Sequence, residues 1–304
     1  MAGSGPLTLS AVVPTYGRDE VLVETLRRLL ALAPPPDEIV VVDQTPAHAP
    51  AVDGRLAAWN REGSIRWRRR ARPSIPAAMN EGLATATGEL VLFLDDDVEP
   101  APDLVAAHRA AHAATGAEIV AGQVLQPGES PEPLVGERFV FRSSEAQPAT
   151  EFMGGNFSVR RRFALELGGF DENFTGAAYR FEADFAARAR AAGGRIWFAP
   201  AASLRHVRAE RGGTRSFGSH LTSVSPAHAV GEYYHLLRNR PRGAVARLLS
   251  RPWRSALTRH HLRCPWWIPV TLAAELAGLA WALRLALAPR RLMAVGAGKA
   301  DDLQ

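Results

Sequence analysis

The sequence predicts an α/β protein with a mostly parallel sheet flanked by helices, followed by a helical C-terminal extension. Three observations lead to this prediction. Over the first two hundred residues, short apolar runs alternate with segments of helical periodicity. Polar residues directly follow three of these apolar runs, as they do at the carboxyl ends of strands in open sheets. Beyond residue 226 the pattern is helical and basic, with a nearly uncharged stretch at 265–288.

The expected elements follow one another in a regular order. The strands are apolar runs, such as EIVVV at 38–42 and LVLFL at 90–94. The first helix is indicated by Leu22, Leu26 and Leu29, which recur at helical spacing. Prolines at 34–36 end that helix, and Gly88 ends the third. Strands are expected at 7–13, 38–42, 65–68, 90–94 and 195–198, helices at 20–33, 52–59, 75–87, 160–167 and 180–192, and a loop at 127–148.

Composition excludes several classes of protein. The chain has 304 residues, of which 47% are hydrophobic and 22% charged, so it folds into a globular structure. Its single cysteine, Cys264, excludes an internal disulfide framework and a cysteine-cluster metal site. The net charge is +5, but the densest basic run, at 66–72, lies inside a strand pattern, so nucleic acid is not an expected partner. Residues 1–5 lack the features of a signal peptide, so we expect a cytoplasmic protein.

Three aspartates, at positions 95–97, directly follow the apolar strand at 90–94. Carboxylates beside a buried strand need compensation, and Mg²⁺ or Mn²⁺ held together with phosphate oxygens supplies it. Alternate residues of an extended segment point the same way, so Asp95 and Asp97 form the natural pair while Asp96 faces elsewhere. Capping of the helix that begins near Pro102 is the structural alternative.

Six segments in a fixed order resemble the family 2 glycosyltransferases with the GT-A fold. They span roughly residues 9–206 and include the second strand, which ends in Asp43. The other five are VVPTYGR (12–18), MNEGLATATGELVLFLDDD (79–97), GGNFSVRR (154–161), GGFDENF (168–174) and FEADFAARARAAG (181–193). The resemblance implies a metal-dependent, inverting transfer of a sugar from a UDP-, GDP- or dTDP-sugar to an acceptor hydroxyl.

The resemblance also assigns a donor site. It implies that the donor is bound by Pro14, Thr15, Tyr16, Arg18, Asp43, Arg72, Asn80, Asp95 and Asp96. Asp43 could instead cap a turn. Mn²⁺ or Mg²⁺ is implied at Asp95, Asp97 and His206, although a lone loop histidine is often only a surface residue. Three arginines after His206 either close over the phosphates as a lid or are solvated; they are Arg208, Arg211 and Arg215.

On the acceptor side the resemblance implies a close-approach turn at Gly154, Gly155 and Asn156. The family pattern Glu-Asp-x-Asp aligns with residues 181–184, which places Glu182 at the position of the base and Phe181 where an acid is common. We expect Glu182 to be the base, with Asp184 as the competing candidate. Both carboxylates could also simply cap the helix N-terminus.

The C-terminal region has three interpretations. Residues 265–288 are long enough to span a bilayer, but Glu275 near the middle would cost roughly 2.5–3.5 kcal/mol. Flanking arginines and tryptophans favour a helix in the membrane interface, at the inner face of the cell membrane. Packing against the catalytic domain or a second subunit is the third. The domains are therefore expected at 7–210, 211–225 (a flexible loop) and 226–304, and the oligomeric state is left open.

Two rival functions share features with this sequence. A nucleotidyltransferase would need a glycine-rich phosphate loop after the first strand, and residues 14–18 lack one. A non-catalytic sugar-nucleotide binding protein stays open because Phe181 replaces an acid. The acceptor, whether a glycan, a lipid-linked molecule or a secondary metabolite, is not specified by the motifs.

Overall fold

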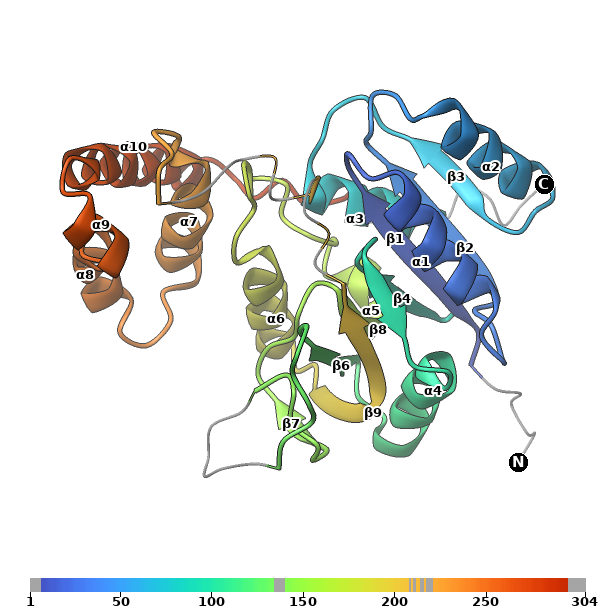
Figure 1. Cartoon of the computed structure of the whole chain (residues 1–304). Coiled ribbons are helices and arrows are strands. Elements are labelled where there is room, and N and C mark those ends of the chain that lie inside the picture. Colours follow the sequence, from blue (N-terminus) through green and yellow to red (C-terminus); the bar gives the residue numbers. More distant parts are fainter. Residues whose placement is uncertain are drawn as a thin grey trace.

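A single nine-stranded sheet forms the centre of the protein (Figure 1). The computed structural model describes residues 7–133, 140–207, 209, 212–213, 216 and 221–294. The strands run in the order β3-β2-β1-β4-β8-β6-β9-β5, and β7 pairs with β9. They are β1 (Leu9–Thr15), β2 (Glu38–Asp43), β3 (Arg66–Arg69), β4 (Leu90–Leu94), β5 (Val98–Pro100), β6 (Ile119–Leu125), β7 (Gln147–Ala149), β8 (Asn156–Arg160) and β9 (Ile196–His206).

The first half of the sheet is parallel, as the alternating pattern predicts. β1 pairs in parallel with β2 and with β4, and β2 pairs in parallel with β3. Thr15 lies opposite Asp43, so the polar residues that end these strands meet at one edge. The helices between them are α1 (Glu20–Leu30), α2 (Pro50–Arg61) and α3 (Ile75–Thr85).

The second half is mixed. β8 is antiparallel to both β4 and β6, and β5 and β7 are antiparallel to β9. The strands β5, β6, β7 and β8 were not predicted, and β7 begins inside the segment 127–148 that was expected to be a loop. The helix α4 (Leu104–Thr115) begins two residues after Pro102, near which a helix was expected. β6 carries Gly122 and Gln123 at a register shift against β9, which breaks the strand pattern in the sequence. β9 continues eight residues beyond the predicted end at 198, because it also pairs with β5.

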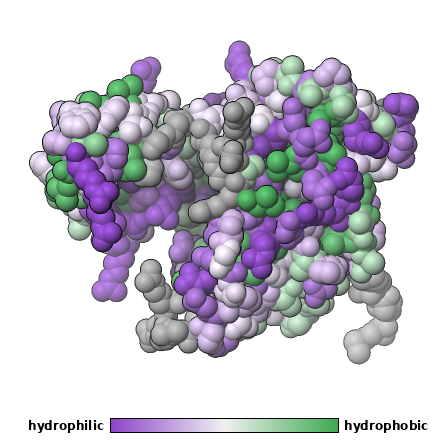
Figure 2. All heavy atoms as spheres, in the orientation of Figure 1, coloured by the Kyte–Doolittle hydropathy of each residue, from purple (hydrophilic) through white to green (hydrophobic). Residues whose placement is uncertain are grey.

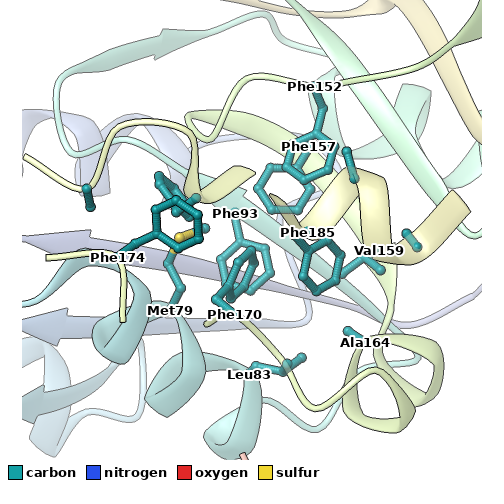
Figure 3. Packing of buried hydrophobic residues seen from close by; sticks show 14 of the residues in the cluster. Met79, Leu83, Phe93, Phe152, Phe157, Val159, Ala164, Phe170, Phe174 and Phe185 are labelled. Carbon is teal, nitrogen blue, oxygen red and sulfur yellow. The ribbon is translucent and has the colours of Figure 1, made fainter. Parts of the chain in front are cut away.

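An aromatic cluster fixes the helix α6 (Phe181–Ala191) against the sheet (Figure 3). The rings of Phe152 and Phe157 stack with centroids 4.0 Å apart, and those of Phe170 and Phe185 with centroids 4.6 Å apart. Phe93 of β4 stacks on Phe157 at 5.0 Å and meets Phe170 edge-on. Such pairs add to the area that they bury, so α6 is held firmly beside β4 and β8. The short helix α5 (Arg161–Glu166) follows β8.

The C-terminal helices form a separate layer beyond α6 (Figure 1). They are η2 (Pro226–His228), α7 (Val230–Asn239), α8 (Ala244–Ala256), α9 (Arg259–Arg263) and α10 (Trp267–Leu287). α10 coincides with the predicted uncharged stretch and packs against α7 and α8. Glu275 in its middle is buried, where its Oε2 accepts a hydrogen bond from the Tyr233 hydroxyl (2.6 Å) and lies 3.0 Å from Arg251 Nε. The structure therefore shows α10 packed against other helices of the same chain.

After α10 the chain returns to the turn at 168–172, which precedes α6. The amide of Glu172 donates to the Arg291 carbonyl, and the amide of Met293 donates to the Gly168 carbonyl. The Arg291 amide donates to Asp171 Oδ1 at 3.0 Å. Residues 289–294 thus form a strap along the turn at 168–172, close to the start of α6.

Candidate active site

A pocket of about 330 Å³ lies at the carboxyl edge of the parallel strands. Its walls come from the segments after β1 and β4, from the turn before β8, from the start of α6 and from the end of β9. The predicted residues that line it are Pro14, Thr15, Tyr16, Arg18, Asp95, Asp96, Asp97, Gly154, Gly155, Glu182 and His206.

Asp95, Asp97 and His206 come together as a group that can hold a metal ion. β5 pairs with the end of β9, which brings His206 opposite Val98 and beside the aspartates. His206 Nε2 lies 3.0 Å from Asp97 Oδ1 and 3.6 Å from Asp95 Oδ2. Two carboxylates and one imidazole suit Mn²⁺, and the carboxylates also suit Mg²⁺, so the residues fit the implied ion.

Gly155 is required where the metal group meets the turn before β8. A Cβ atom at this position would lie 2.2 Å from Asp95 Oδ2, well inside any normal contact. The Asp95 amide in turn donates to the Gly155 carbonyl at 3.3 Å. The glycine therefore lets the backbone of β8 approach the carboxylate.

Asp96 faces away from this group, as the alternation predicts. Its Oδ2 accepts a hydrogen bond of 2.6 Å from the Thr15 hydroxyl, and its Oδ1 lies 3.6 Å from Arg18 Nε. Burial raises the pKa of Asp96 to about 7, against the opposing effect of Arg18 and Thr15. Arg18 also lies 3.4 Å from Asp97, and its Nε and Nη1 make no hydrogen bond within the described part of the chain. Arg18 thus carries spare donors at the pocket wall, suited to anionic oxygens.

Glu182 lies in the first turn of α6 and lines the pocket opposite the metal group. Its Oε2 is buried and has no hydrogen-bond partner among the residues that the structure describes. Burial raises the pKa of this carboxyl to about 7, while Arg180 opposes the shift. A carboxyl group with a raised pKa and a free oxygen is equipped to accept a proton near neutral pH.

Asp184, two residues further along the helix, lies outside the pocket lining. Its Oδ2 accepts from Arg188 Nε at 2.9 Å, and its Oδ1 accepts from Asn239 Nδ2 at 2.8 Å and from Arg290 Nη1. Burial raises the pKa of Asp184, but the charges of Arg188 and Arg290 outweigh burial and hold it below its usual value. Both oxygens are thus used in the interior, and the geometry favours Glu182 over Asp184 as the base.

Asp43 belongs to an internal network instead of the pocket lining. Its Oδ1 accepts from the Thr45 amide, and its Oδ2 accepts from Trp67 Nε1 at 2.9 Å and lies 2.8 Å from His48 Nε2. The other ring nitrogen of His48 contacts Asp19 at 2.6 Å. Sequence reasoning missed His48, because a single histidine in a loop carries no local signal.

Two predicted amides and one arginine also point elsewhere. Asn80 bonds both the amide and the carbonyl of Phe170, which ties α3 to the turn at 168–172. Asn156 Nδ2 donates to the carbonyls of Gln123 and Ala202, both at 2.9 Å. Arg72 is exposed and lies outside the pocket lining. The proposed lid arginines, Arg208, Arg211 and Arg215, lie outside the described residues.

The pocket wall also contains residues that were not predicted, among them Met153, Tyr179 and Gly213. Met153 directly precedes the turn before β8, and Tyr179 lies just before the start of α6. The amide of Gly213 donates to the carbonyl of Tyr16, next to the end of β1, at 2.8 Å. Met153 and Tyr179 lie next to the motifs at 154–161 and 181–193, and this position in the sequence is the feature that could have identified them.

Comparisons with known proteins agree with this geometry. The model of glycosyl transferase family 2 matches residues 10–185, which is more than half of the chain. No curated protein matches the sequence significantly. Among solved structures, GalNAc-T7 with UDP, GalNAc and Mn²⁺ has a TM-score of 0.57 at 18% identity, over 78% of this chain and 51% of that one. This chain therefore spans about half the length of GalNAc-T7 in that structure.

Two further structures match over more of their length. The mannosyltransferase PcManGT from Pyrobaculum calidifontis, in complex with GDP-Man and Mn²⁺, has a TM-score of 0.55 at 22% identity, over 93% of this chain and 80% of that one. Residues 1–349 of S. aureus TarS also give 0.55, at 15% identity, over 89% of this chain and 91% of that one. At these identities the likeness concerns the fold, and it confirms the predicted α/β architecture.

Proposed function

Because the chain belongs to glycosyl transferase family 2, we propose that it transfers a sugar from a nucleoside-diphosphate sugar to an acceptor hydroxyl in one inverting step. One observation carries the mechanism: the free carboxylate oxygen of Glu182 and the group of Asp95, Asp97 and His206 line the same pocket. The UDP and GDP-mannose in the neighbouring structures support a nucleotide-sugar donor. The family assignment favours transfer over the nucleotidyltransferase and non-catalytic alternatives.

The donor end of the pocket holds the diphosphate in this proposal. Asp95, Asp97 and His206 would hold Mn²⁺ or Mg²⁺, which when bound neutralises charge on the departing diphosphate. Arg18 donates from Nε and Nη1 to phosphate oxygens, and Thr15 keeps Asp96 turned away from them. The rest of the proposed donor contacts, at Pro14 and Tyr16, come from the same wall.

The base acts from the opposite side. Glu182 Oε2 takes the proton of the acceptor hydroxyl while that oxygen attacks the anomeric carbon. The bond between the sugar and the diphosphate breaks in the same step, so the configuration inverts. Glu182 remains protonated until it releases the proton to solvent, and the step requires no protein nucleophile.

The test is nucleoside-diphosphate release from UDP-, GDP- and dTDP-sugars, with Mn²⁺ or Mg²⁺, compared between the native enzyme and two variants. Glu182→Gln should reduce transfer by about 100-fold or more and leave donor binding intact. Asp97→Asn should abolish the metal-dependent release of nucleoside diphosphate. Glu166→Gln, an exposed glutamate of α5, is the matched control. A native rate in Glu182→Gln would move the base elsewhere, and absence of donor binding in the presence of metal would refute the function.

We also propose that the C-terminal helices attach peripherally to an anionic membrane surface on the cytoplasmic side. Apolar and hydrophilic side chains lie side by side over these helices (Figure 2). Large apolar side chains are well exposed there, among them Leu249, Trp253, Leu262 and Trp266. Arg254 and Arg263 are exposed beside them, and mixed apolar and basic faces suit the interface of anionic lipids.

The buried contacts of Glu275 oppose a role for α10 as a membrane-spanning helix. α10 is long and apolar enough to cross a membrane, with 22% of its most apolar window buried in the protein. Crossing would have to break the buried contacts of Glu275, at a cost. We therefore propose a division into a catalytic domain at 7–210, a connecting segment at 211–225 and an extension at 226–304, whose described helices pack against α6 and against one another.

Sedimentation with phosphatidylcholine vesicles, with and without phosphatidylglycerol, tests the attachment. The double variant Leu249→Glu/Trp253→Glu should lose binding to the anionic vesicles. Val224→Glu, at an exposed valine outside these helices, should bind as the native chain does. Equal binding by all three chains, or none by the native chain, would contradict peripheral attachment through α8.

A further inference from the structure

A second pocket, of about 370 Å³, lies between the start of α6 and the C-terminal helices. Tyr179 and Glu182 line both this pocket and the proposed donor pocket. The opposite wall comes from α8 and α10, including Ser255 and Thr271. Glu182 therefore stands at the junction of two cavities, one on the side of the metal group and one on the side of the extension.

Apart from Glu182, the carboxylates of this second pocket are already paired with arginines. Glu232 accepts from Arg180 Nε at 2.6 Å and from Arg247 Nη2 at 2.9 Å. Glu275 lies 3.0 Å from Arg251 Nε. Among the residues that the structure describes, both arginines of the lining, Arg180 and Arg251, thus have a carboxylate partner, so neither is free to pair with a phosphate or a carboxylate.

The remaining lining suits hydroxyl groups. Ser223, Ser255 and Thr271 contribute hydroxyls, and the paired carboxylates retain lone pairs for further hydrogen bonds. Tyr179 is 44% exposed, so it offers aromatic surface to a ligand in the pocket. Hydroxyls, ion pairs and one aromatic face together bind a neutral, polyhydroxylated molecule through hydrogen bonds and contact with its C–H face.

We propose that this pocket is the acceptor site and that the acceptor portion it binds is a neutral carbohydrate. The inference rests on the proposed function and extends it. The acceptor hydroxyl would reach Glu182 from the side of the extension, while the donor lies on the side of the metal group. The C-terminal helices then form a wall of the acceptor site, and their side chains select the acceptor.

The test uses the full chain with Mn²⁺ and whichever donor sugar it hydrolyses. The probes are neutral methyl glycosides of glucose, galactose and mannose, with glucuronic acid and glucose 6-phosphate as anionic counterparts. The measured quantity is nucleoside-diphosphate release above the rate without acceptor. Ser255→Phe fills the pocket from α8, and Ala274→Met fills it from α10. Ala246→Phe, at an exposed position of α8 outside the pocket lining, is the matched control.

At least one neutral glycoside should stimulate release, and the anionic probes should not. Both filling variants should raise the KM for that glycoside at least tenfold, with the donor KM and the acceptor-free hydrolysis unchanged. The unchanged hydrolysis also shows that the variants are folded. Stimulation only by anionic probes, by no probe, or equally in the filled variants would overturn the inference. If the native chain hydrolyses none of the donor sugars, that result would instead contradict the proposed function itself.

Discussion

Replacing Arg290 by alanine should destabilise the protein and weaken its catalysis together. Arg290 Nη1 bonds Asp184 Oδ1 and lies 3.2 Å from Asp171 Oδ2, and Nη2 donates to Asn239 Oδ1 at 2.9 Å. Neither carboxylate has any exposed side-chain surface. The variant therefore leaves two buried negative charges with one cationic partner fewer.

The magnitude follows from what each carboxylate keeps. Removing one partner of a buried ion pair typically costs about 3–5 kcal/mol. Asp184 retains Arg188, and Asp171 retains the hydroxyl of Tyr234 at 2.7 Å, so we expect a loss of about 2–3 kcal/mol. At about 2–4 °C for each kcal/mol, the Tm should fall by about 4–12 °C.

Arg291→Ala is the matched control, because its guanidinium is 67% exposed and lies 3.7 Å from Glu172. An exposed pair of this kind contributes little, so the change should stay within about 0.5 kcal/mol. Urea unfolding followed by circular dichroism gives both free energies of unfolding. Nucleoside-diphosphate release should also fall in Arg290→Ala, because Glu182 lies only two residues before Asp184 on α6. Equal losses in the two variants, or a native stability in Arg290→Ala, would refute the reasoning.

Three further outcomes are expected. Gly155→Ala should weaken Mn²⁺ binding measured by calorimetry, since its Cβ displaces the carboxylate of Asp95, whereas unchanged affinity would exclude that carboxylate as a ligand. His206→Ala should lower the same affinity by about tenfold or more without loss of Tm, and a smaller effect would remove this residue from the ligand set. Burial lowers the pKa of His108 to about 3 and of His112 to about 4, so below pH 6.5 the unfolded chain binds protons that the folded chain does not. Asp96 and Glu182, whose pKa is raised to about 7, take up protons in the folded chain over the same range and offset this effect, so it is measured in the Asp96→Asn/Glu182→Gln variant. There the free energy of unfolding should be about 2–4 kcal/mol lower at pH 5 than at pH 7.5, and a flat urea-unfolding profile would contradict the burial of the two rings.

Local patterns were enough to predict the parallel half of the sheet. β1, β2 and β4 are continuous apolar runs, and the polar residues behind them meet because parallel strands end at one edge. Asp95 and Asp97 could be paired by the alternation of an extended segment alone. The confirmed family resemblance supplied what local patterns lack, namely the approach of His206 from more than a hundred residues away.

The parts that were not predicted depend on distant partners. Asn80 and Asn156 carry the same amide group that a donor site would use, but their partners lie 90 and 33–46 residues away. A buried amide is taken by whichever backbone groups the fold leaves unsatisfied, and that choice is invisible in the sequence. Glu275 is similar, because its burial depends on Tyr233 of α7 and Arg251 of α8, which only the fold brings beside α10.

The strap at 289–294 gives the protein a particular order of completion during synthesis. Asp184 is made early, but its contact with Arg290 requires a residue that follows 106 positions later. A ribosome that has released α6 has therefore not yet supplied one of the charges that holds the helix in place. The contacts that hold α6 and the turn at 168–172 are complete only when the last helices have emerged and residues 289–294 have folded back over that turn.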